Sequence, residues 1–313
     1  MEYITIKNTD LKVSRICIGG DPMGGHAWGA VNDEELLEAI DTAIENGINF
    51  FDTADIYGLG HAEELLGKAV KGRREKVIIA TKFGVRFKND GTGCYYDNSP
   101  NWIREAVKGS LKRLETDYID IYQLHWRDGI TPISDIIDEL EHLKKEGLIR
   151  YYGLSNVSKQ DLSELLPYKG KFVTFQNQYS LACRDFEKDM FFLSDQMHMT
   201  PLTWGSLGQG ILTGKYGKDV VFDSSDRRSR PTYPNFHGEK LLKNLDIVDK
   251  MREIGPCYNK EPAAIAIRFI LDYLKDSVVI VGVKNKKQVI SNCEAVDWKL
   301  SSEHIYELLK ISE

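Results

Sequence analysis

The sequence has few features of a secreted, membrane-spanning or nucleic-acid-binding protein. Its five cysteines are scattered and form no close pairs, so neither a disulfide framework nor a zinc site is expected. No apolar run approaches membrane-spanning length, and residues 1–7 lack the long apolar core of a secretion signal. The net charge is −6 and no long basic run is present, which argues against a general nucleic-acid binder. We therefore expect a cytoplasmic protein with no metal site, no membrane partner and no nucleic-acid partner.

The sequence also lacks the glycine fingerprint of the doubly wound dinucleotide-binding fold. That fold normally carries Gly-x-Gly-x-x-Gly directly after its first strand. Here Gly19-Gly20 continues into Asp21-Pro22, and Gly24-Gly25 does not complete the pattern. An open doubly wound sheet is therefore disfavoured.

What the 313 residues do contain is an alternation of strand-like and helical segments. From Ile16 onward there are about eight apolar strand-like runs, and segments with helical spacing of apolar residues separate nearly all of them. A small hairpin is expected before them, over residues 3–14, and two short helices are expected near 287–293 and 302–310. Eight strand–helix units close into a barrel. We predict one α/β domain over residues 1–313, a (β/α)8 TIM barrel with an N-terminal β-hairpin and extra C-terminal helices.

One long irregular segment, residues 218–238, interrupts this alternation. It contains Asp226-Arg227-Arg228-Ser229-Arg230 and two prolines. A loop of this length in a compact fold is usually a lid or a binding loop. Its arginines are either phosphate ligands or solvated surface charges, and the sequence leaves both interpretations open.

Five of the strand-like runs are followed or closed by a polar residue: Asp52, Lys82, His125, Asn156 and Gln176. An acid at the end of a buried strand is unfavourable for packing, because a buried carboxylate needs a partner. The carboxyl ends of the strands are, however, the edge at which barrel enzymes perform chemistry. Five polar residues at one edge therefore predict a functional site.

Two mechanisms suit these residue types, with Tyr57 five residues after Asp52. In the first, Lys82 is a desolvated amine that forms a Schiff base with a carbonyl substrate. In the second, Lys82 stays charged beside Asp52 and lowers the pKa of Tyr57. The Tyr57 phenol then exchanges a proton with a carbonyl oxygen or an alcohol, and His125 polarises or orients that oxygen. The second mechanism requires a nicotinamide cofactor, because no side chain donates a hydride.

The motifs around these residues resemble those of the aldo-keto reductase family over essentially the whole chain. The matching segments, in family order and spacing, are Phe51-Asp52-Thr53-Ala54 with Tyr57-Gly58, Thr81-Lys82, Leu124-His125 and Gly153-Leu154-Ser155-Asn156. The resemblance implies a (β/α)8 barrel that binds NADP(H) without a Rossmann domain. It also implies a catalytic tetrad of Asp52, Tyr57, Lys82 and His125, with Tyr57 as the general acid.

Further positions follow from the same resemblance. Ser155, Asn156 and Gln176 match residues that bind the nicotinamide carboxamide, and Trp204 matches an aromatic residue that stacks on the nicotinamide ring. The segment from Gly205 to Lys215 looks like the pyrophosphate loop, because glycines let backbone N–H groups approach phosphates closely; its candidate residues are Gly205, Ser206, Leu207, Gln209, Gly210 and Lys215. The adenosine end is implied at Gly282, Lys284, Gln288 and Asn292. Lys284 would be the cation for a 2′-phosphate, which favours NADP over NAD.

The substrate pocket is predicted from aromatic residues, one aliphatic residue and one cation near the tetrad: Trp28, Ile56, Phe83, Trp126 and Arg127, with Tyr95 and Tyr96 as further candidates. The predicted activity is the NADP(H)-dependent reduction of an aldehyde or ketone to the alcohol. An NADP-linked sugar or polyol dehydrogenase working in the oxidative direction is the alternative, followed by a redox-sensing regulatory subunit. The loop lengths resemble a bacterial branch of the family that includes general-stress and inositol-linked reductases. The substrate is a small carbonyl compound or a sugar or polyol, and no oligomeric state is predicted.

Overall fold

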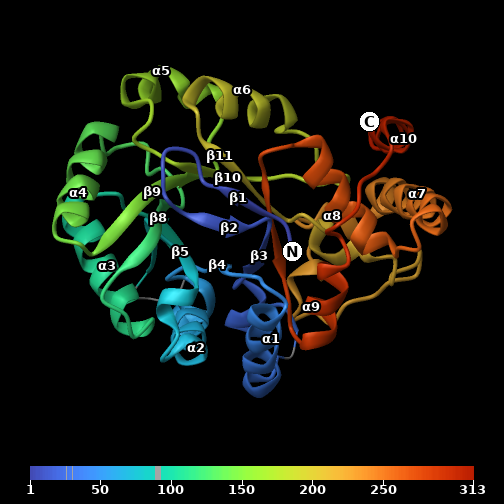
Figure 1. Cartoon of the computed structure of the whole chain (residues 1–313), viewed down its shortest axis with the longest axis horizontal. Coiled ribbons are helices and arrows are strands. Elements are labelled where there is room, and N and C mark those ends of the chain that lie inside the picture. Colours follow the sequence, from blue (N-terminus) through green and yellow to red (C-terminus); the bar gives the residue numbers. More distant parts are fainter. Residues whose placement is uncertain (26, 30, 89–92) are drawn as a thin grey trace.

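Eight parallel strands form a closed barrel, as predicted (Figure 1). The computed structural model describes residues 1–25, 27–29, 31–88 and 93–313. The neighbouring strands around the barrel follow the order β10-β11-β12-β3-β4-β5-β8-β9. Their bounds are β3 (Ile16–Gly19), β4 (Phe50–Asp52), β5 (Ile78–Phe83), β8 (Ile119–Leu124), β9 (Ile149–Ser155), β10 (Thr174–Gln178), β11 (Thr200–Trp204) and β12 (Val278–Gly282).

Among the described residues, seven helices connect successive barrel strands, and α9, which follows the last strand, joins them around the barrel (Figure 1). They are α1 (Asp33–Glu45), α2 (His61–Val70), α3 (Pro100–Arg113), α4 (Ile133–Lys145), α5 (Leu162–Leu165), α6 (Glu187–Met197), α8 (Pro262–Tyr273) and α9 (Lys286–Cys293). The caps that the sequence indicates are present on α1 and α3: Asn32 accepts a hydrogen bond from the Glu35 amide, and Ser99 accepts one from the Trp102 amide.

Two further helices lie outside this ring and pack against each other, at the right of Figure 1. α10 (Ser302–Ile311) is the predicted C-terminal helix. α7 (Gly238–Ile254) follows the irregular segment 218–238 and was not among the predicted elements, although Leu241, Leu245, Val248 and Met251 form a buried apolar face at helical spacing.

The predicted N-terminal hairpin closes one end of the barrel. It consists of β1 (Tyr3–Thr5) and β2 (Lys12–Ser14), which pair antiparallel. Ile6, Leu11 and Val13 belong to the same buried apolar cluster as Cys17 and Phe50 of the barrel strands. Since apolar side chains fill that end, the polar strand ends at the opposite edge are the accessible end of the barrel.

A second hairpin follows β5 at this polar edge. It joins β6 (Val85–Phe87) to β7 (Cys94–Tyr96) and was not predicted. Phe87, Tyr95 and Tyr96 are exposed on it, so the aromatic side chains of this hairpin face solvent.

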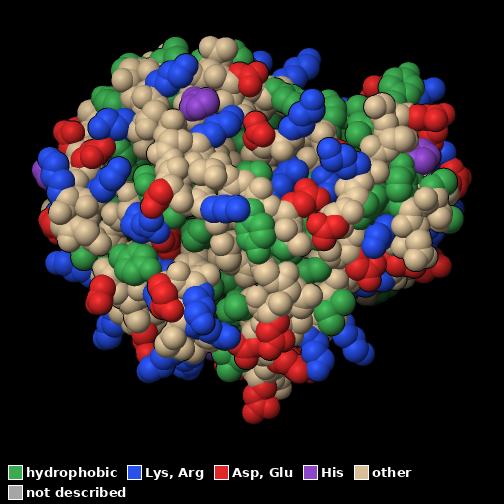
Figure 2. All heavy atoms as spheres, in the orientation of Figure 1, with side chains coloured by type: hydrophobic (Ala, Val, Ile, Leu, Met, Phe, Trp, Pro, Cys, Tyr) green, Lys and Arg blue, Asp and Glu red, His purple; other side chains and the backbone are tan. Residues whose placement is uncertain are grey.

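The surface visible in Figure 2 carries acidic and basic side chains side by side. Among the described residues, no helix combines the length and the hydropathy that crossing a lipid bilayer requires.

Candidate active site

Lys82 lies at the centre of the site and connects Asp52 to Tyr57. It is the fifth residue of β5, and its side chain is completely buried. Its Nζ donates hydrogen bonds to Asp52 Oδ1 at 2.6 Å, to the Thr53 carbonyl at 2.8 Å and to the Tyr57 phenol oxygen at 3.3 Å. All three donor positions of the ammonium group are therefore used, one of them on the predicted general acid.

The environment of Lys82 keeps it charged. Burial alone would lower the pKa of the amine, but Asp52 and then Tyr57 outweigh burial and raise the pKa of Lys82 above its ordinary value. A permanently protonated amine is not a nucleophile, so the structure does not favour the Schiff-base mechanism.

Tyr57 differs from the sequence-based expectation. Burial is the largest influence on its phenol and raises its pKa above the ordinary value, and the lowering by Lys82 does not offset it. The prediction that Lys82 brings the pKa of Tyr57 down is therefore wrong as a net effect. Tyr57 is protonated at neutral pH, which is the state that a proton donor requires.

His125 completes the tetrad directly after β8. Its ring lies edge-on to the ring of Tyr57, with 6.0 Å between centroids. Burial, followed by the positive charge of Lys82, lowers the pKa of His125 well below its ordinary value, so the imidazole is neutral. Its Nδ1 is buried without a hydrogen-bond partner, which leaves a polar ring atom available at the site.

Two glycines allow the loop that carries Tyr57 to reach this position. Gly58 has a left-handed φ of 60°, and the loop crosses the β3–α1 loop at Gly24. A Cβ on Gly24 would lie 2.5 Å from the Gly58 nitrogen, so only glycine fits there. The two backbones are thus in contact beside the Tyr57 phenol.

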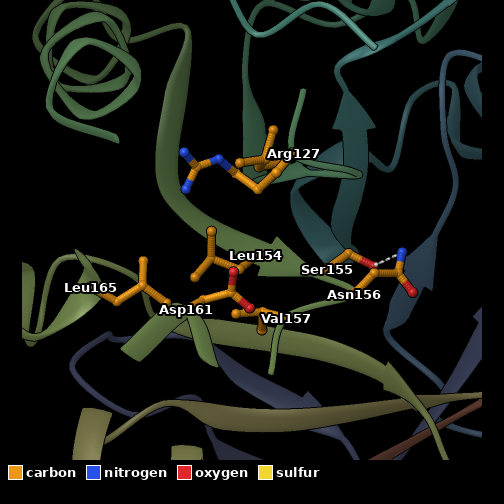
Figure 3. Close-up of a pocket in the computed structure, with 8 residues that line it drawn as sticks. Arg127, Leu154, Ser155, Asn156, Val157, Asp161 and Leu165 are labelled. Carbon is orange, nitrogen blue, oxygen red and sulfur yellow. Dashed lines mark hydrogen bonds between the residues drawn. The ribbon is translucent and has the colours of Figure 1, made fainter. Parts of the chain in front are cut away.

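The three residues predicted to bind the nicotinamide carboxamide lie together at the ends of β9 and β10. Asn156 has a left-handed φ of 56°, and its Nδ2 donates to the Ser155 hydroxyl and to the His125 carbonyl (Figure 3). Ser155 in turn donates to the Gln176 carbonyl at 3.0 Å. The Gln176 side chain points into the barrel, where its Nε2 donates to Asp52 Oδ2 at 2.8 Å. The structure brings the three together and connects them to the tetrad.

The predicted substrate-pocket residues are only partly brought together. Phe83 is a correction: it is completely buried and packs on Tyr122, between the barrel and its helices. Side chains alternate along a strand, so once Lys82 points into the barrel its neighbour must point outward. Ile56 lies beside Tyr57 in the same turn. Trp126 is 39% exposed and stacks on Tyr96 of the β6–β7 hairpin, with 6.0 Å between ring centroids.

Arg127 has partners away from the tetrad, whereas the partner of Trp28 is Asp21, whose charge acts on Tyr57. The Arg127 guanidinium forms a bidentate ion pair with Glu164 of α5 and donates to the Thr131 carbonyl. In Figure 3 its side chain extends away from Ser155 and Asn156, although all three line the same cavity. Its charge is thus neutralised within the protein. The Trp28 indole N–H donates to Asp21.

The segment after β11 has the backbone geometry of an anion cradle. Gly205, Gly208, Gln209 and Gly210 all have positive φ. Turns of this kind direct successive N–H groups to one side, where they bind phosphate oxygens. Asn235 donates to Gln209 Oε1 at 2.6 Å, which attaches the segment to the long loop.

The remaining side chains of this segment lie on both sides of the turn. Trp204, at the end of β11, and Leu207 are partly buried, and Lys215 is exposed. The Ser206 hydroxyl bonds to Thr203, so only its backbone is available to a phosphate.

Cations gather at the predicted adenosine end. Lys284 follows β12, and its Nζ donates to the Trp28 carbonyl. Burial is the main cause that lowers the pKa of Lys284, and the charges of Arg228 and Lys215 add to it. Asp226 offsets part of this positive charge through its ion pair with Arg228. Because these positive charges repel one another, an anion bound between them would reduce the repulsion.

The other predicted residues of this end lie on and before α9. The Gln288 side chain accepts from the Lys284 amide at 2.8 Å, Gly282 ends β12, and Asn292 is buried. The amide donors, the phosphate cradle and the cation group together fit a dinucleotide with an additional phosphate.

Of the three arginines in the long loop, Arg228 belongs to this cation group, but its guanidinium already forms a bidentate ion pair with Asp226 and donates to the Tyr216 hydroxyl. Arg227 pairs with Asp21, and Arg230 is exposed.

Gln123 is a site residue that the sequence-based prediction missed. It is completely buried on β8, and its Nε2 donates to Asp52 Oδ2 at 3.1 Å. A signal was present, because Gln123 and His125 lie two residues apart and therefore on the same side of the strand.

A buried polar cluster beneath the Tyr57 loop was also missed. Glu63 accepts hydrogen bonds from Thr81 at 2.6 Å and from Arg113 at 2.7 Å. Asp55 lies close to it, and burial, followed by the charge of Glu63, raises the pKa of Asp55 to about 8.

Comparisons with known proteins agree with this geometry. The model of the aldo/keto reductase family matches residues 15–313. The chain is 34% identical to the aldo-keto reductase YhdN of Bacillus subtilis, over 100% of this chain and 94% of that protein. The glycerol dehydrogenase AKR11B4 of Gluconobacter oxydans has a similar structure, with a TM-score of 0.90, 31% identity and coverage of 99% and 94% of the two chains. An aldo-keto reductase of Klebsiella pneumoniae, solved in complex with NADPH, matches with a TM-score of 0.78, 25% identity and coverage of 100% and 96%. The chain therefore belongs to the aldo-keto reductase family, a class of NADP(H)-dependent oxidoreductases.

Proposed function

We propose that this chain reduces an aldehyde or ketone to the alcohol with NADPH, and that Tyr57 donates the proton. The observation that carries this proposal is the buried ammonium of Lys82, 3.3 Å from the Tyr57 phenol oxygen at the polar end of the barrel. An acid that gives up its proton at this place leaves an anion next to a fixed positive charge.

Each tetrad residue has one task in this reaction. Tyr57 donates its proton to the carbonyl oxygen, and Lys82 stabilises the phenolate that remains. Asp52 accepts from Lys82 Nζ at 2.6 Å and keeps the ammonium charged and oriented. Neutral His125 polarises or orients the substrate oxygen. The bound nicotinamide supplies the hydride, and the tetrad handles the proton.

The cofactor is held at three places along the polar edge. Ser155, Asn156 and Gln176 would bind the carboxamide, beside Trp204. The positive-φ turn from Gly205 to Gly210 would bind the pyrophosphate. Lys284 would bind the 2′-phosphate, because the nearby charge of Arg228 repels its ammonium and an anion would relieve that repulsion.

Oxidation of a sugar or polyol is the second candidate function. A solved structure with a TM-score of 0.90 to this chain is titled a glycerol dehydrogenase. The same tetrad works in that direction when the Tyr57 phenolate accepts the proton of the alcohol. Since the pKa of Tyr57 is raised, oxidation is expected to become faster as the pH rises toward that pKa, whereas reduction does not need the phenolate.

The first experiment is a panel of aldehydes, ketones, sugars and polyols assayed in both directions with NADP(H) and with NAD(H). We expect NADPH-dependent carbonyl reduction to give the highest kcat/KM at pH 7. Tyr57→Phe should reduce kcat at least about a hundredfold, a magnitude typical of losing a general acid. It should leave NADPH binding, followed by tryptophan fluorescence, within about twofold. Turnover at the wild-type rate in Tyr57→Phe would refute the assignment of the acid.

The cellular location stays a prediction. All five cysteines are free thiols, as a reducing compartment requires.

A further inference from the structure

The Asp52 carboxylate is held from two sides. Oδ1 accepts from Lys82, whereas Oδ2 accepts from two side-chain amides, Gln176 at 2.8 Å and Gln123 at 3.1 Å. Neither glutamine is more than 2% exposed. The orientation of the carboxylate toward Lys82 thus depends on these two amides.

The two glutamines differ in what else they can reach. Gln176 lies with Ser155 and Asn156, at the place proposed for the nicotinamide carboxamide, where a bound cofactor would compete for its amide. Gln123 faces the barrel interior, where its Oε1 accepts from Thr174 at 3.4 Å. Gln123 is therefore the amide that stays on Asp52 whether or not the cofactor is bound.

We propose that Gln123 is a positioning residue for the reaction, which fixes Asp52 Oδ2 so that Oδ1 stays on Lys82 and Lys82 stays on Tyr57. The inference rests on the proposed function, because it assigns Gln123 a task in the proton transfer by Tyr57. Without the Gln123 amide, Oδ2 keeps a single donor in a buried site, and that donor is the one the cofactor recruits. The carboxylate is then free to rotate, and the ammonium loses its fixed orientation toward the phenol.

The titratable groups that face this carboxylate come from several elements. They are Lys82 on β5, Cys17 on β3 and Tyr57 in the loop after β4, while His125 after β8 faces Lys82. Lys82 is charged at pH 7, and the other three groups are neutral. A second carboxylate introduced beside Asp52 would therefore be repelled by Asp52 and attracted by Lys82.

The variant that separates positioning from packing is Gln123→Glu, which keeps the shape of the side chain. Its protonated carboxyl still offers an O–H donor to Asp52, whereas the ionised form repels it. We expect kcat close to that of the wild type at low pH. Above the pH at which the new carboxyl ionises, kcat should fall about tenfold per pH unit, whereas the wild type should change little between pH 6 and 8.

Gln123→Leu should lower kcat about tenfold or more at every pH. The KM for the carbonyl and the Kd for NADPH should stay within about twofold of the wild type. Tyr122→Phe is the matched control: Tyr122 is the preceding residue on β8, it points to the opposite side, and its buried hydroxyl has no hydrogen-bond partner. That variant should keep the wild-type kcat and its pH profile.

A measurement on the cofactor-free protein gives a readout independent of turnover. The Tm of Gln123→Glu should fall relative to the wild type as the pH rises from 5 to 9, because folding then brings two carboxylates together, while the Tm difference of Gln123→Leu should stay constant. A wild-type kcat in Gln123→Leu, or a Gln123→Glu profile parallel to that of the wild type, would overturn the inference. If the wild type reduced no carbonyl and oxidised no alcohol, the proposed function would fail, and the Tm series would still decide whether residue 123 acts on Asp52.

Discussion

The buried Asp52–Lys82 ion pair allows us to predict how substitutions change both the unfolding free energy and the enzymatic activity. Both side chains are almost fully buried, and their charged atoms lie 2.6 Å apart. Removing one partner of such a pair leaves an uncompensated buried charge, which typically costs about 3–5 kcal/mol of unfolding free energy. Replacing both partners by neutral groups removes the charge altogether and typically costs far less.

The hydrogen bonds around each partner place the single variants at the low end of that range. In Asp52→Asn, the ammonium keeps the Thr53 carbonyl and the Tyr57 phenol oxygen as acceptors. In Lys82→Met, the carboxylate keeps the amides of Gln123 and Gln176 as donors. We therefore expect each single substitution to lower the unfolding free energy by about 3 kcal/mol. The double substitution should lower it by about 1–2 kcal/mol, instead of the ~6 kcal/mol expected if the two single effects were additive.

Urea unfolding of the cofactor-free protein at pH 7, followed by circular dichroism and tryptophan fluorescence, measures these differences. All three variants should also lose carbonyl reduction, because each removes the charge beside Tyr57 or its support. The double variant is the decisive one, since it should recover stability without recovering activity. A double variant whose loss equals the sum of the single losses to within about 0.5 kcal/mol would refute the reasoning.

Two further predictions concern a buried acid and a cation. Burial, followed by Glu63, raises the pKa of Asp55 from 3.8 to about 8, so the folded protein retains a proton that the unfolded chain releases. The unfolding free energy should therefore fall as the pH rises from about 4 to about 8, by at most ~1.4 kcal/mol per pH unit. Asp55→Asn should flatten this pH dependence in urea unfolding experiments. An unchanged pH dependence would contradict the raised pKa of Asp55. Lys284→Ala should weaken NADPH binding about tenfold to a hundredfold, the value of one charge-assisted hydrogen bond, and leave NADH binding within about twofold. An equal loss of affinity for NADPH and NADH in fluorescence titrations would show that Lys284 does not bind the 2′-phosphate.

The barrel could be predicted from the sequence because its strands and helices have strong, regular signals. Short apolar runs such as Val278–Gly282 alternate with amphipathic segments, and caps such as Asn32 mark where helices begin. The positions of Asp52 and Lys82 at strand ends, together with family motifs, were enough to predict the tetrad. Their mutual geometry follows from the barrel, which brings β4 and β5 side by side.

Other features depended on three-dimensional contacts that the sequence does not display. The net pKa shift of Tyr57 is set by burial, which outweighs the visible charge of Lys82. Phe83 was misplaced because aromatic character was considered without the alternation of side chains along β5. Gln123 was missed because it lies within β8, one residue before the end of the strand, and only the residues at or after the strand ends were considered.

The crossing of the loops at Gly24 and Gly58 limits where the substrate range of this protein can be redesigned. The two backbones are in contact, so neither position accepts a side chain without moving the loop that carries Tyr57. The β6–β7 hairpin differs from this crossing because Tyr95 and Tyr96 are exposed on it. We expect that these side chains can be replaced without moving the tetrad. Libraries that seek new substrates should therefore vary the hairpin, together with Trp126, which stacks on it, and leave the glycine crossing intact.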